Sequence, residues 1–507
     1  MSVGPLDTLN IILTGMTAAQ AQTDVAGQNI ANASNPHYAV ETVDQAPLLG
    51  SPVPMAAGLV GPGAFGGGVD ITGVERQAPA YLSATARQAE AASAYAATVA
   101  TALQNAQTIF QEPSSNGIAA LMEQFFNNLT ALSQDPSNIG AKAAVVGAAQ
   151  TLVQAFHTVA AGLSQAQTNV MTQLADTVAS DNTILGQVAQ LDGQIQQLEI
   201  AGENPNALLD QRSGLLDQLA KDLGATVQVV NLTDASGQPI RNPEGQPVTT
   251  IQVTLPDGTM LVDGTVASTL SVAAGPPPTV QVTGPGGSPV TPAWGSGQWG
   301  TVGGLLALVG SSGLLSGDGL SSYSGSWLNQ LDQVAAGLAA AINPLQTGGY
   351  APDPTTGVMT QQTNTPFFEA DVGGTLSATG PYTAANLVVN PTLVNTPSLV
   401  AAAATPNPND GSNAAQMALV GSDPSGPLAQ YQQIIAAIGS QVQSAQQVDT
   451  TLKAVAAQAE QAREAVSGVS INEEVVHISF ASQTYQALAK TMATLQAMVA
   501  ALLDSVQ

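Results

Sequence analysis

The chain has 507 residues, of which 44% are hydrophobic, 9% are charged and 4% are aromatic. This composition favours long helices and plain strands and supplies few groups for acid–base catalysis. Nine basic and 35 acidic residues give a formal net charge of −26, which argues against nucleic acid as a partner because a phosphate backbone would be repelled. The sequence has no cysteine, which excludes disulfides, thiolate nucleophiles and zinc–sulfur sites.

The N-terminal region carries no pattern typical of a Sec signal peptide. The first basic residue is Arg76, so no positively charged segment precedes an apolar one, and we expect no such peptide. We also find no apolar stretch of about 20 residues, the length that spans a bilayer. A cytoplasmic protein and a protein exported by another route both fit these observations.

Residues 1–44 are expected to form an N-terminal helix with one narrow apolar stripe, ending near Asn35 and Pro36. The stripe consists of Leu6, Leu9, Leu13 and Met16, and Ile30 continues it. Residues 45–80 begin with a stretch dense in proline and glycine and continue with the alternating run 69–71. We interpret them as a linker followed by a short strand.

Residues 81–225 show helical periodicity throughout and predict a helical bundle, with helices at about 81–111, 116–133, 138–199 and 205–223. At 1.5 Å per residue, the third helix would be a rod of about 90 Å. It carries a heptad seam made of Val170, Leu174, Ile184, Val188, Leu191, Ile195 and Leu198. Thr177 and Asp181 interrupt this seam, either as a polar layer that sets the register or as a buried functional aspartate.

Residues 226–410 change to a period of two with turn signals between the runs, so we expect a β-rich insertion that also contains one helix near 326–342. Residues 411–468 return to helical periodicity and would rejoin the bundle. Residues 469–507 form the last expected helix, with Ser470 and Glu473 as a capping box at its start. Its apolar stripe consists of Ile478, Tyr485, Leu488, Met492, Leu495, Val499 and Leu502.

These elements predict a multidomain α+β fold with a terminal α-helical coiled coil, a long-helix bundle and a β-rich inserted domain. The stripe of each terminal helix is too narrow to face a globular core. We therefore expect the terminal helices to pair with each other and with neighbouring copies of the chain. Their two stripes are the predicted assembly interface.

No set of residues has the spacing of a catalytic, cofactor or metal site. The three histidines, His37, His157 and His477, lie far apart and form no two-histidine ligand motif. Residues 61–66 match G-x-G-x-x-G, but no strand leads into them and no helix follows, so we interpret them as a flexible turn. We expect no catalytic residue, no cofactor and no metal, while a Ser-His-Asp triad assembled in space stays an alternative.

Signatures at opposite ends of the chain resemble those of flagellar rod, hook and hook-associated proteins, the axial proteins of the bacterial flagellum. The N-terminal signature comprises residues 14–20, Asn29, Asn32 and Tyr38. The C-terminal signature comprises residues 467–474, 485–487 and 489–490. Their order along the chain is that of the axial proteins, so we identify the chain as resembling this group.

Three internal segments narrow the resemblance to the family of hook-associated protein 1, FlgK. One is similar to a Leu-Leu-Asp-Gln-Arg segment of that family and consists of Leu208, Leu209, Asp210, Gln211 and Arg212. Residues 68–76 are similar to the strand that follows the family's linker. Residues 341–343, 349–357 and 367–368 resemble its helix ending in asparagine, its glycine-rich loop and its paired aromatic residues. The resemblance extends from residue 6 to residue 502.

The resemblance implies a non-enzymatic structural subunit of the bacterial flagellum that forms the hook–filament junction and is required for filament attachment. It implies export by the flagellar type III apparatus to an extracellular position. The implied partners are the hook protein, the second junction protein, further copies of the chain in a ring, and a cytosolic export chaperone, with no nucleic acid and no membrane. The alternatives are another axial protein of the hook or rod and, less favoured, an axial scaffold that carries an adhesin or an enzyme in its insertion.

Overall fold

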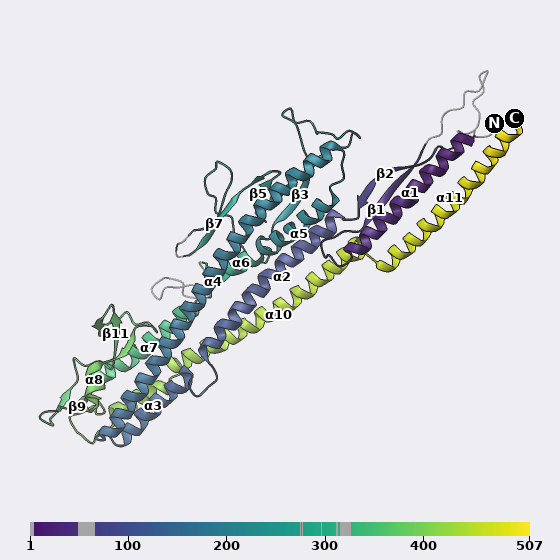
Figure 1. Ribbon diagram of the computed structural model, residues 1–507. Coiled ribbons are helices and arrows are strands. Elements are labelled where there is room, and N and C mark those ends of the chain that lie inside the picture. The colour runs from purple at the N-terminus through teal and green to yellow at the C-terminus, as the bar shows by residue number, and fades with distance from the viewer. Residues whose placement is uncertain are drawn as a thin grey trace.

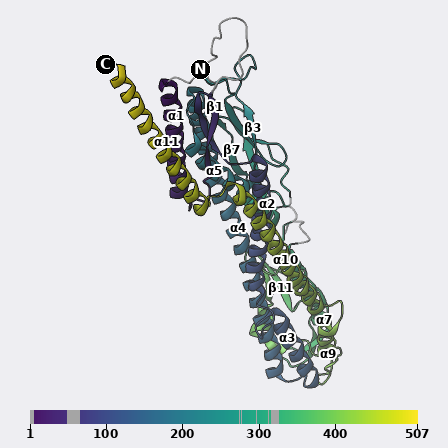
Figure 2. The same ribbon diagram turned by 90° about the vertical axis from the view of Figure 1, so that its right-hand side faces the viewer.

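Three long helices run side by side through the centre of an elongated molecule (Figure 1). The computed structural model describes residues 5–48, 66–273, 275, 277–295, 297–310, 313–314 and 326–506. The three helices are α2 (Ala80–Gln107), α4 (Ile139–Ala201) and α10 (Pro427–Ser467). Figure 2, turned by 90°, shows the same rod with the terminal helices at one end.

Shorter helices complete the bundle beside these three. They are α3 (Ile118–Gln134), α5 (Asn206–Leu223), α6 (Gly300–Val309), α7 (Trp327–Gly348) and α9 (Ser412–Leu419). The helices predicted between residues 81 and 223 begin and end within four residues of the observed ones. The largest difference is at the end of α2, where the last residues form a separate 3₁₀ turn, η1 (Thr108–Phe110).

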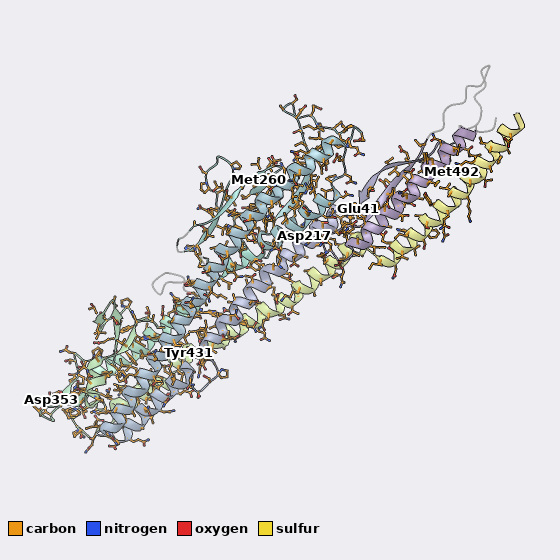
Figure 3. All side chains as sticks on the ribbon, viewed as in Figure 1. Glu41, Asp217, Met260, Asp353, Tyr431 and Met492 are labelled. Carbon is orange, nitrogen blue, oxygen red and sulfur yellow. The ribbon has the colours of Figure 1, made fainter. Side chains whose placement is uncertain are left out.

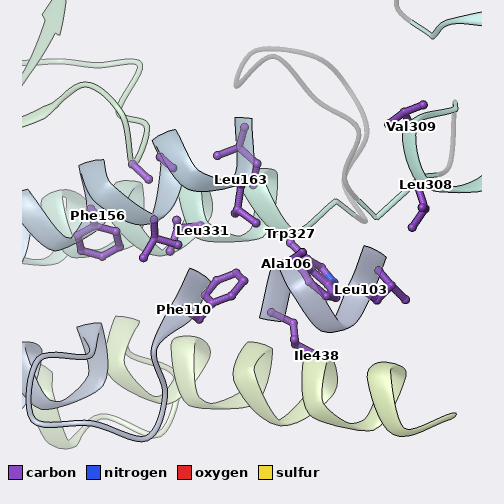
Figure 4. Close-up of a cluster of buried hydrophobic side chains, with 14 of the residues drawn as sticks. Leu103, Ala106, Phe110, Phe156, Leu163, Leu308, Val309, Trp327, Leu331 and Ile438 are labelled. Carbon is purple, nitrogen blue, oxygen red and sulfur yellow. The ribbon is translucent and has the colours of Figure 1, made fainter. Parts of the chain in front are cut away.

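The core of the rod contains aromatic side chains from several helices. Phe110 and Trp327 are almost fully buried and pack edge to face, with ring centroids 6.0 Å apart. Figure 4 shows them among Phe156 of α4, Leu331 of α7 and Ile438 of α10. The Trp327 indole N–H donates a hydrogen bond to the side-chain oxygen of Gln441 (3.0 Å), which satisfies its one polar atom. Helix α7 is thus part of the bundle core.

The buried seam of α4 differs from the predicted one at several positions, where the buried residue is the next one along the chain. Its members are Val170, Leu174, Val178, Asp181, Leu185, Val188, Asp192 and Ile195. Val178 is buried at the place expected for Thr177. The steps from Val170 to Leu174 and from Leu174 to Val178 are both four residues long, which follows the 3.6-residue helical period more closely than a strict heptad does. Ile184, Leu191 and Leu198 are therefore only half-buried. Asp192, which we had not singled out, lies inside the seam.

Helix α4 also corrects our expectation about apolar stretches. Among the described helices, it is long and apolar enough to cross a membrane by length and composition alone. In its most apolar window, 44% of the residues are buried inside the protein. These residues contribute to the bundle core, and a single such helix is weak evidence for a membrane span.

The residues expected to form one β-rich insertion are divided between two regions of the rod. The first region packs along the half of α4 nearer the terminal helices (Figure 1). It is an antiparallel sheet of β3 (Thr226–Asn231), β4 (Thr249–Thr254), β5 (Met260–Asp263) and β6 (Val266–Ala267), with a hairpin of β7 (Thr269–Ala273) and β8 (Thr279–Thr283).

The second region caps the other end of the rod, around α7 and α9 (Figure 1). It contains β9 (Tyr350–Pro352), β10 (Met359–Gln361), β11 (Phe368–Val372), β12 (Thr375–Ser377), β13 (Leu387–Val389), α8 (Pro391–Asn395), η2 (Pro397–Leu399) and η3 (Val420–Ser422). Asn343 near the end of α7 holds this region. Its amide nitrogen donates to Phe368 O (2.9 Å), and its oxygen accepts from the N–H groups of Phe367 and Phe368 (3.0 and 2.8 Å).

Helix α6 lies between the two β regions and was not predicted. Its three glycines, Gly300, Gly303 and Gly304, disfavour a helix by intrinsic propensity. Tertiary packing reverses this preference, because a Cβ atom on Gly304 would lie 2.9 Å from the Tyr95 carbonyl oxygen of α2. Glycine is thus needed where α6 approaches the α2 backbone.

Candidate assembly interface

One end of the rod is a separate unit that we call the terminal module. It consists of α1 (Pro5–Asn32), β1 (Glu41–Leu48), β2 (Gly68–Arg76) and α11 (Ile471–Val506). The antiparallel pairing of β1 with β2 includes residues 45–48, which we expected to be linker. Of the G-x-G-x-x-G match, residues 61–65 lie outside the described residues.

Helices α1 and α11 pack side by side in both views (Figures 1 and 2). They approach each other closely at Gly15, where a Cβ atom would lie 2.9 Å from Cδ1 of Leu488. Ile12, Ala19 and Ala26 of α1 are buried, and their positions lie within about 60° of Gly15 on a 100° helical wheel. The small residues on this face, Gly15, Ala19 and Ala26, thus let the two helices approach each other closely.

The β1–β2 hairpin covers a second face of α1. The Thr14 hydroxyl accepts a hydrogen bond from the Val69 N–H (3.3 Å) and donates one to the Ile11 carbonyl oxygen (2.9 Å). Gly68, with φ = 109°, lies directly against Thr14, so that a side chain there would clash with it. Helix α1 is therefore held between α11 and the hairpin.

Asn29 joins the end of α1 to the start of β1. It is 1% exposed, and its amide nitrogen donates to Glu41 O (2.9 Å). Its amide oxygen accepts from Glu41 N–H (3.0 Å) and from the Tyr38 hydroxyl (2.8 Å). Burial, with Glu41 nearby, raises the pKa of Tyr38, so its hydroxyl stays a donor. The side chain of Asn32, the other signature asparagine, donates to the Gln28 carbonyl oxygen of its own helix (3.0 Å).

The predicted interface residues fall into three groups. The half-buried group consists of Leu9, Met16, Ile30, Ile478, Leu488, Met492, Leu495 and Val499. Leu13 and Tyr485 are 53% and 41% exposed, so they lie outside the contact between α1 and α11, in contrast to a seam made of the whole stripe. The side chains of Leu6 and Leu502 lie outside the described residues.

Helix α11 also has exposed apolar residues that the sequence analysis did not single out. Phe480 and Met498 are 65% and 58% exposed and lie 18 residues, or five full turns, apart on one line of the helix. Val475 and Ile471 are exposed as well. Their spacing is visible in the sequence as a second apolar line beside the predicted stripe. Figure 3 shows side chains such as Met492 projecting along α11 at the end of the molecule.

The predicted capping box is half formed. The Ser470 hydroxyl accepts a hydrogen bond from the Glu473 N–H (3.4 Å), and two acidic residues, Glu473 and Glu474, occupy the first turn of α11. The carboxylate of Glu474 is 3.8 Å from His477 Nδ1. This helix start fixes where α11 leaves the bundle.

The segment from Leu208 to Arg212 supports the base of the terminal module. Asp210 accepts a hydrogen bond from Arg76 Nε of β2 (2.5 Å). Arg212 pairs with Asp192 of α4, whose other carboxylate oxygen accepts from the Thr250 hydroxyl of β4 (2.6 Å). Burial raises the pKa of Asp210, although Arg76 opposes the rise. Leu208 and Leu209 are half-buried and Gln211 is exposed.

The histidines are not brought together. His157 Nε2 lies 2.8 Å from the Leu387 carbonyl oxygen in the distal region, whereas His37 lies 3.4 Å from Asp217 beside the terminal module. Within the described residues, no three histidine, aspartate or glutamate side chains are placed to hold a metal. A cavity of about 840 Å³ lies between the turn after α1 and helices α4 and α5. Its walls carry many side-chain amides, those of Gln28, Asn32, Asn35, Gln187, Gln190, Gln211 and Gln218.

Comparisons with known proteins agree with one another. Residues 103–368 match the family model of the flagellar hook-associated protein FlgK helical domain. Flagellar hook-associated protein 1 of Bacillus subtilis is 26% identical, covering 95% of this chain and 94% of the relative. The Salmonella typhimurium protein of the same name is 30% identical over 45% of this chain and 41% of its own length.

A solved structure is similar in fold. The flagellar hook junction protein FlgK from Burkholderia pseudomallei superposes with a TM-score of 0.56 at 18% identity. The match covers 76% of this chain and all of that chain. At this identity the similarity concerns the fold alone.

Proposed function

The chain belongs to the family of the flagellar hook-associated protein FlgK, and from this premise we propose that it is a structural subunit of the bacterial flagellum at the hook–filament junction, required for filament attachment. The helical-domain match over residues 103–368 favours this function over that of a hook or rod protein. The proposed role needs no enzymatic activity and no cofactor.

The proposed location is extracellular, at the junction, after export by the flagellar type III apparatus. The proposed partners are the hook protein on one side, the second junction protein on the other, and copies of this chain arranged in a ring. A cytosolic export chaperone is the proposed partner before secretion. The relatives of this chain are flagellar hook-associated proteins by name, which supports partners among the flagellar axial proteins.

The observation that carries the proposal is the unsatisfied apolar surface of the paired terminal helices. Leu13 of α1 and Phe480 and Tyr485 of α11 stay exposed after the two helices have packed together. Exposed apolar residues concentrated on one helix pair are typical of an interaction site. We propose that neighbouring flagellar subunits cover it, which makes the terminal helices the assembly interface.

Electron microscopy of a strain that lacks the gene tests the proposed function. We expect cells with hooks but without attached filaments, and we expect filaments to return when the gene is supplied in trans. Normal filaments in the deletion strain would contradict the junction role. Cells without hooks would place the protein earlier in assembly, in the rod or hook.

A further inference from the structure

The carboxylate of Asp217 lies where four segments of the chain meet. One oxygen accepts a hydrogen bond from Arg87 Nε of α2 (2.7 Å), and the other accepts from Arg463 of α10 (2.9 Å). His37, in the turn after α1, places Nδ1 3.4 Å from the second oxygen. Asp217 itself belongs to α5. Figure 3 shows it beside Glu41, at the boundary between the terminal module and the bundle.

The chain passes between the terminal module and the bundle at two places, and both lie close to this carboxylate. The first is the connection from β2 to α2, residues 77–79, and the second is the connection from α10 to α11, residues 468–470. Arg87 lies two turns into α2, and Arg463 lies about one turn before the end of α10. Asp217 therefore ties together the two helices that carry the module.

Further polar contacts cross the same boundary. The Val40 N–H donates to the Ser467 carbonyl oxygen at the end of α10 (2.8 Å). The Asn204 amide donates to the Val74 carbonyl oxygen of β2 (2.6 Å). A Cβ atom on Gly214 would lie 3.0 Å from the His37 ring, so α5 and the turn after α1 are in close contact. We use the name joint for a set of six ionisable residues: His37, Arg76, Arg87, Asp210, Asp217 and Arg463.

The charge distribution of the chain singles out the joint. The chain has only nine basic residues, five of them arginines. Three arginines belong to the joint, namely Arg76, Arg87 and Arg463. A fourth, Arg212, lies on the same helix as Asp210 and Asp217 and pairs with Asp192. A guanidinium group donates in a fixed plane, so its contacts with a carboxylate have a preferred direction that apolar packing lacks. Burial acts to raise the pKa of Asp217, but Arg87 and Arg463 outweigh it and hold that pKa below its ordinary value.

We propose that Asp217 is a positioning residue, whose contacts with Arg87, Arg463 and His37 fix the orientation of the terminal helix pair relative to the bundle. This role goes beyond subunit assembly, because it concerns the angle at which the assembly interface is presented. This positioning takes place within one chain and requires no contact with another flagellar protein. Without the charge of Asp217, the two guanidinium groups lose their common partner, and the two connections become free to bend separately.

Distance measurements between two spin labels test this inference on the full-length monomer. Because the chain has no cysteine, Gln443→Cys on α10 and Thr484→Cys on α11, both exposed positions, can be labelled specifically. Pulsed electron paramagnetic resonance should give a narrow distance distribution for the parent protein. With Asp217→Asn we expect the distribution to become at least twofold broader. Lys453→Gln is the matched control, since it breaks an ion pair within α10 alone (2.7 Å) and should leave the width unchanged.

An unchanged width in Asp217→Asn, with helical content and melting temperature also unchanged, would overturn the inference. If Asp217→Asn does not fold, Arg463→Gln and Arg87→Gln each keep one arginine on Asp217, and each should broaden the distribution while the protein stays helical. If these variants also unfold, the joint is a requirement for folding and the positioning role is wrong. A narrow distribution in Asp217→Asn combined with lost filament attachment would contradict the positioning role and leave the proposed function intact.

Discussion

Leu488 of α11 lies over Gly15 of α1, at a distance that leaves no room for a branched side chain: a Cβ atom on Gly15 would be 2.9 Å from Leu488 Cδ1. Gly15→Leu should therefore separate the two helices and speed amide hydrogen exchange along α11. Gly27→Leu on the same helix is the control, because nothing lies within 4 Å of that position. Equal exchange rates in the two variants would show that the helices do not depend on close contact at Gly15.

Gly15→Ala should behave differently from Gly15→Leu. The atom that a new Cβ meets is the end of a flexible leucine side chain, which can move by a few tenths of an ångström. Alanine also has a helix propensity about 1 kcal/mol better than glycine. We expect unchanged or slightly slower exchange in α11, and strongly accelerated exchange would mean that Leu488 cannot move.

Asn29→Ala should weaken the terminal module without unfolding the bundle. The change removes three hydrogen bonds and leaves the buried N–H and carbonyl of Glu41 without partners, at a cost of about 1–3 kcal/mol for each unpaired group. Hydrogen exchange of residues 38–48 measures the effect. Asn32→Ala loses only a bond within its own helix and should change exchange little. Similar effects of both changes would contradict the role assigned to Asn29.

Asp181 makes stability depend on pH. It is fully buried, and its carboxylate oxygens have no hydrogen-bond partner within the described part of the chain. Burial raises its pKa to about 8, and Asp222 adds to the rise. Between the ordinary value of 3.8 and 8, the folded protein keeps a proton that the unfolded chain has lost. Stability should therefore fall as pH rises through this window, by at most about 1.4 kcal/mol per pH unit.

Urea unfolding across this pH window measures the contribution of Asp181. Asp181→Asn cannot ionise, so its free energy of unfolding should fall less steeply with pH than that of the parent protein. Asp176→Asn on the exposed side of the same helix controls for the loss of one acid. Parallel curves for the parent protein and Asp181→Asn would show that Asp181 does not titrate in this window.

Breaking the buried pair of Arg212 and Asp192 should lower the free energy of unfolding strongly, whereas replacing both residues should lower it much less. Asp192→Leu leaves the Arg212 guanidinium buried without its carboxylate, at a cost of about 3–5 kcal/mol. The double change Asp192→Leu with Arg212→Met removes both charges and should recover much of that loss. Thermal melts of the two variants give the comparison. A double variant less stable than Asp192→Leu would show that Arg212 stabilises the fold independently of Asp192.

The long helices were predictable because they present several apolar residues at helical spacing, as α4 does over 63 residues. The shift from Thr177 to Val178 in the buried seam could not be predicted. Either residue fits the local pattern, and packing against neighbouring elements decides between them. Helix α6 escaped prediction because its glycines disfavour a helix and only the nearby α2 backbone explains them.

The candidate interface was only partly predictable from the sequence. The stripe residues could be identified from the sequence, but their exposed fractions in the folded chain could not. Leu13 and Tyr485 are exposed whereas Leu488 is not, and this difference arises only from the way α1 packs. The partners in the joint are separated by more than 100 residues, as Arg87 and Asp217 are. Neither spacing nor local charge indicates such a pair in one sequence. The motif residues Asp210 and Arg212 thus gained a physical role only in the folded structure.

The variant Leu488→Asp tests directly whether the paired terminal helices are the assembly interface. Leu488 is half-buried against Gly15, so an unpaired carboxylate there would lose part of its hydration and should separate the two helices. For Leu488→Asp we expect a secreted monomer with the melting temperature of the parent bundle that fails to attach filaments, while Gln483→Asp, an exposed change on the same helix, should attach them normally. Normal attachment by Leu488→Asp, or unfolding of its central bundle in thermal melts, would show that the helix pair is not the assembly interface.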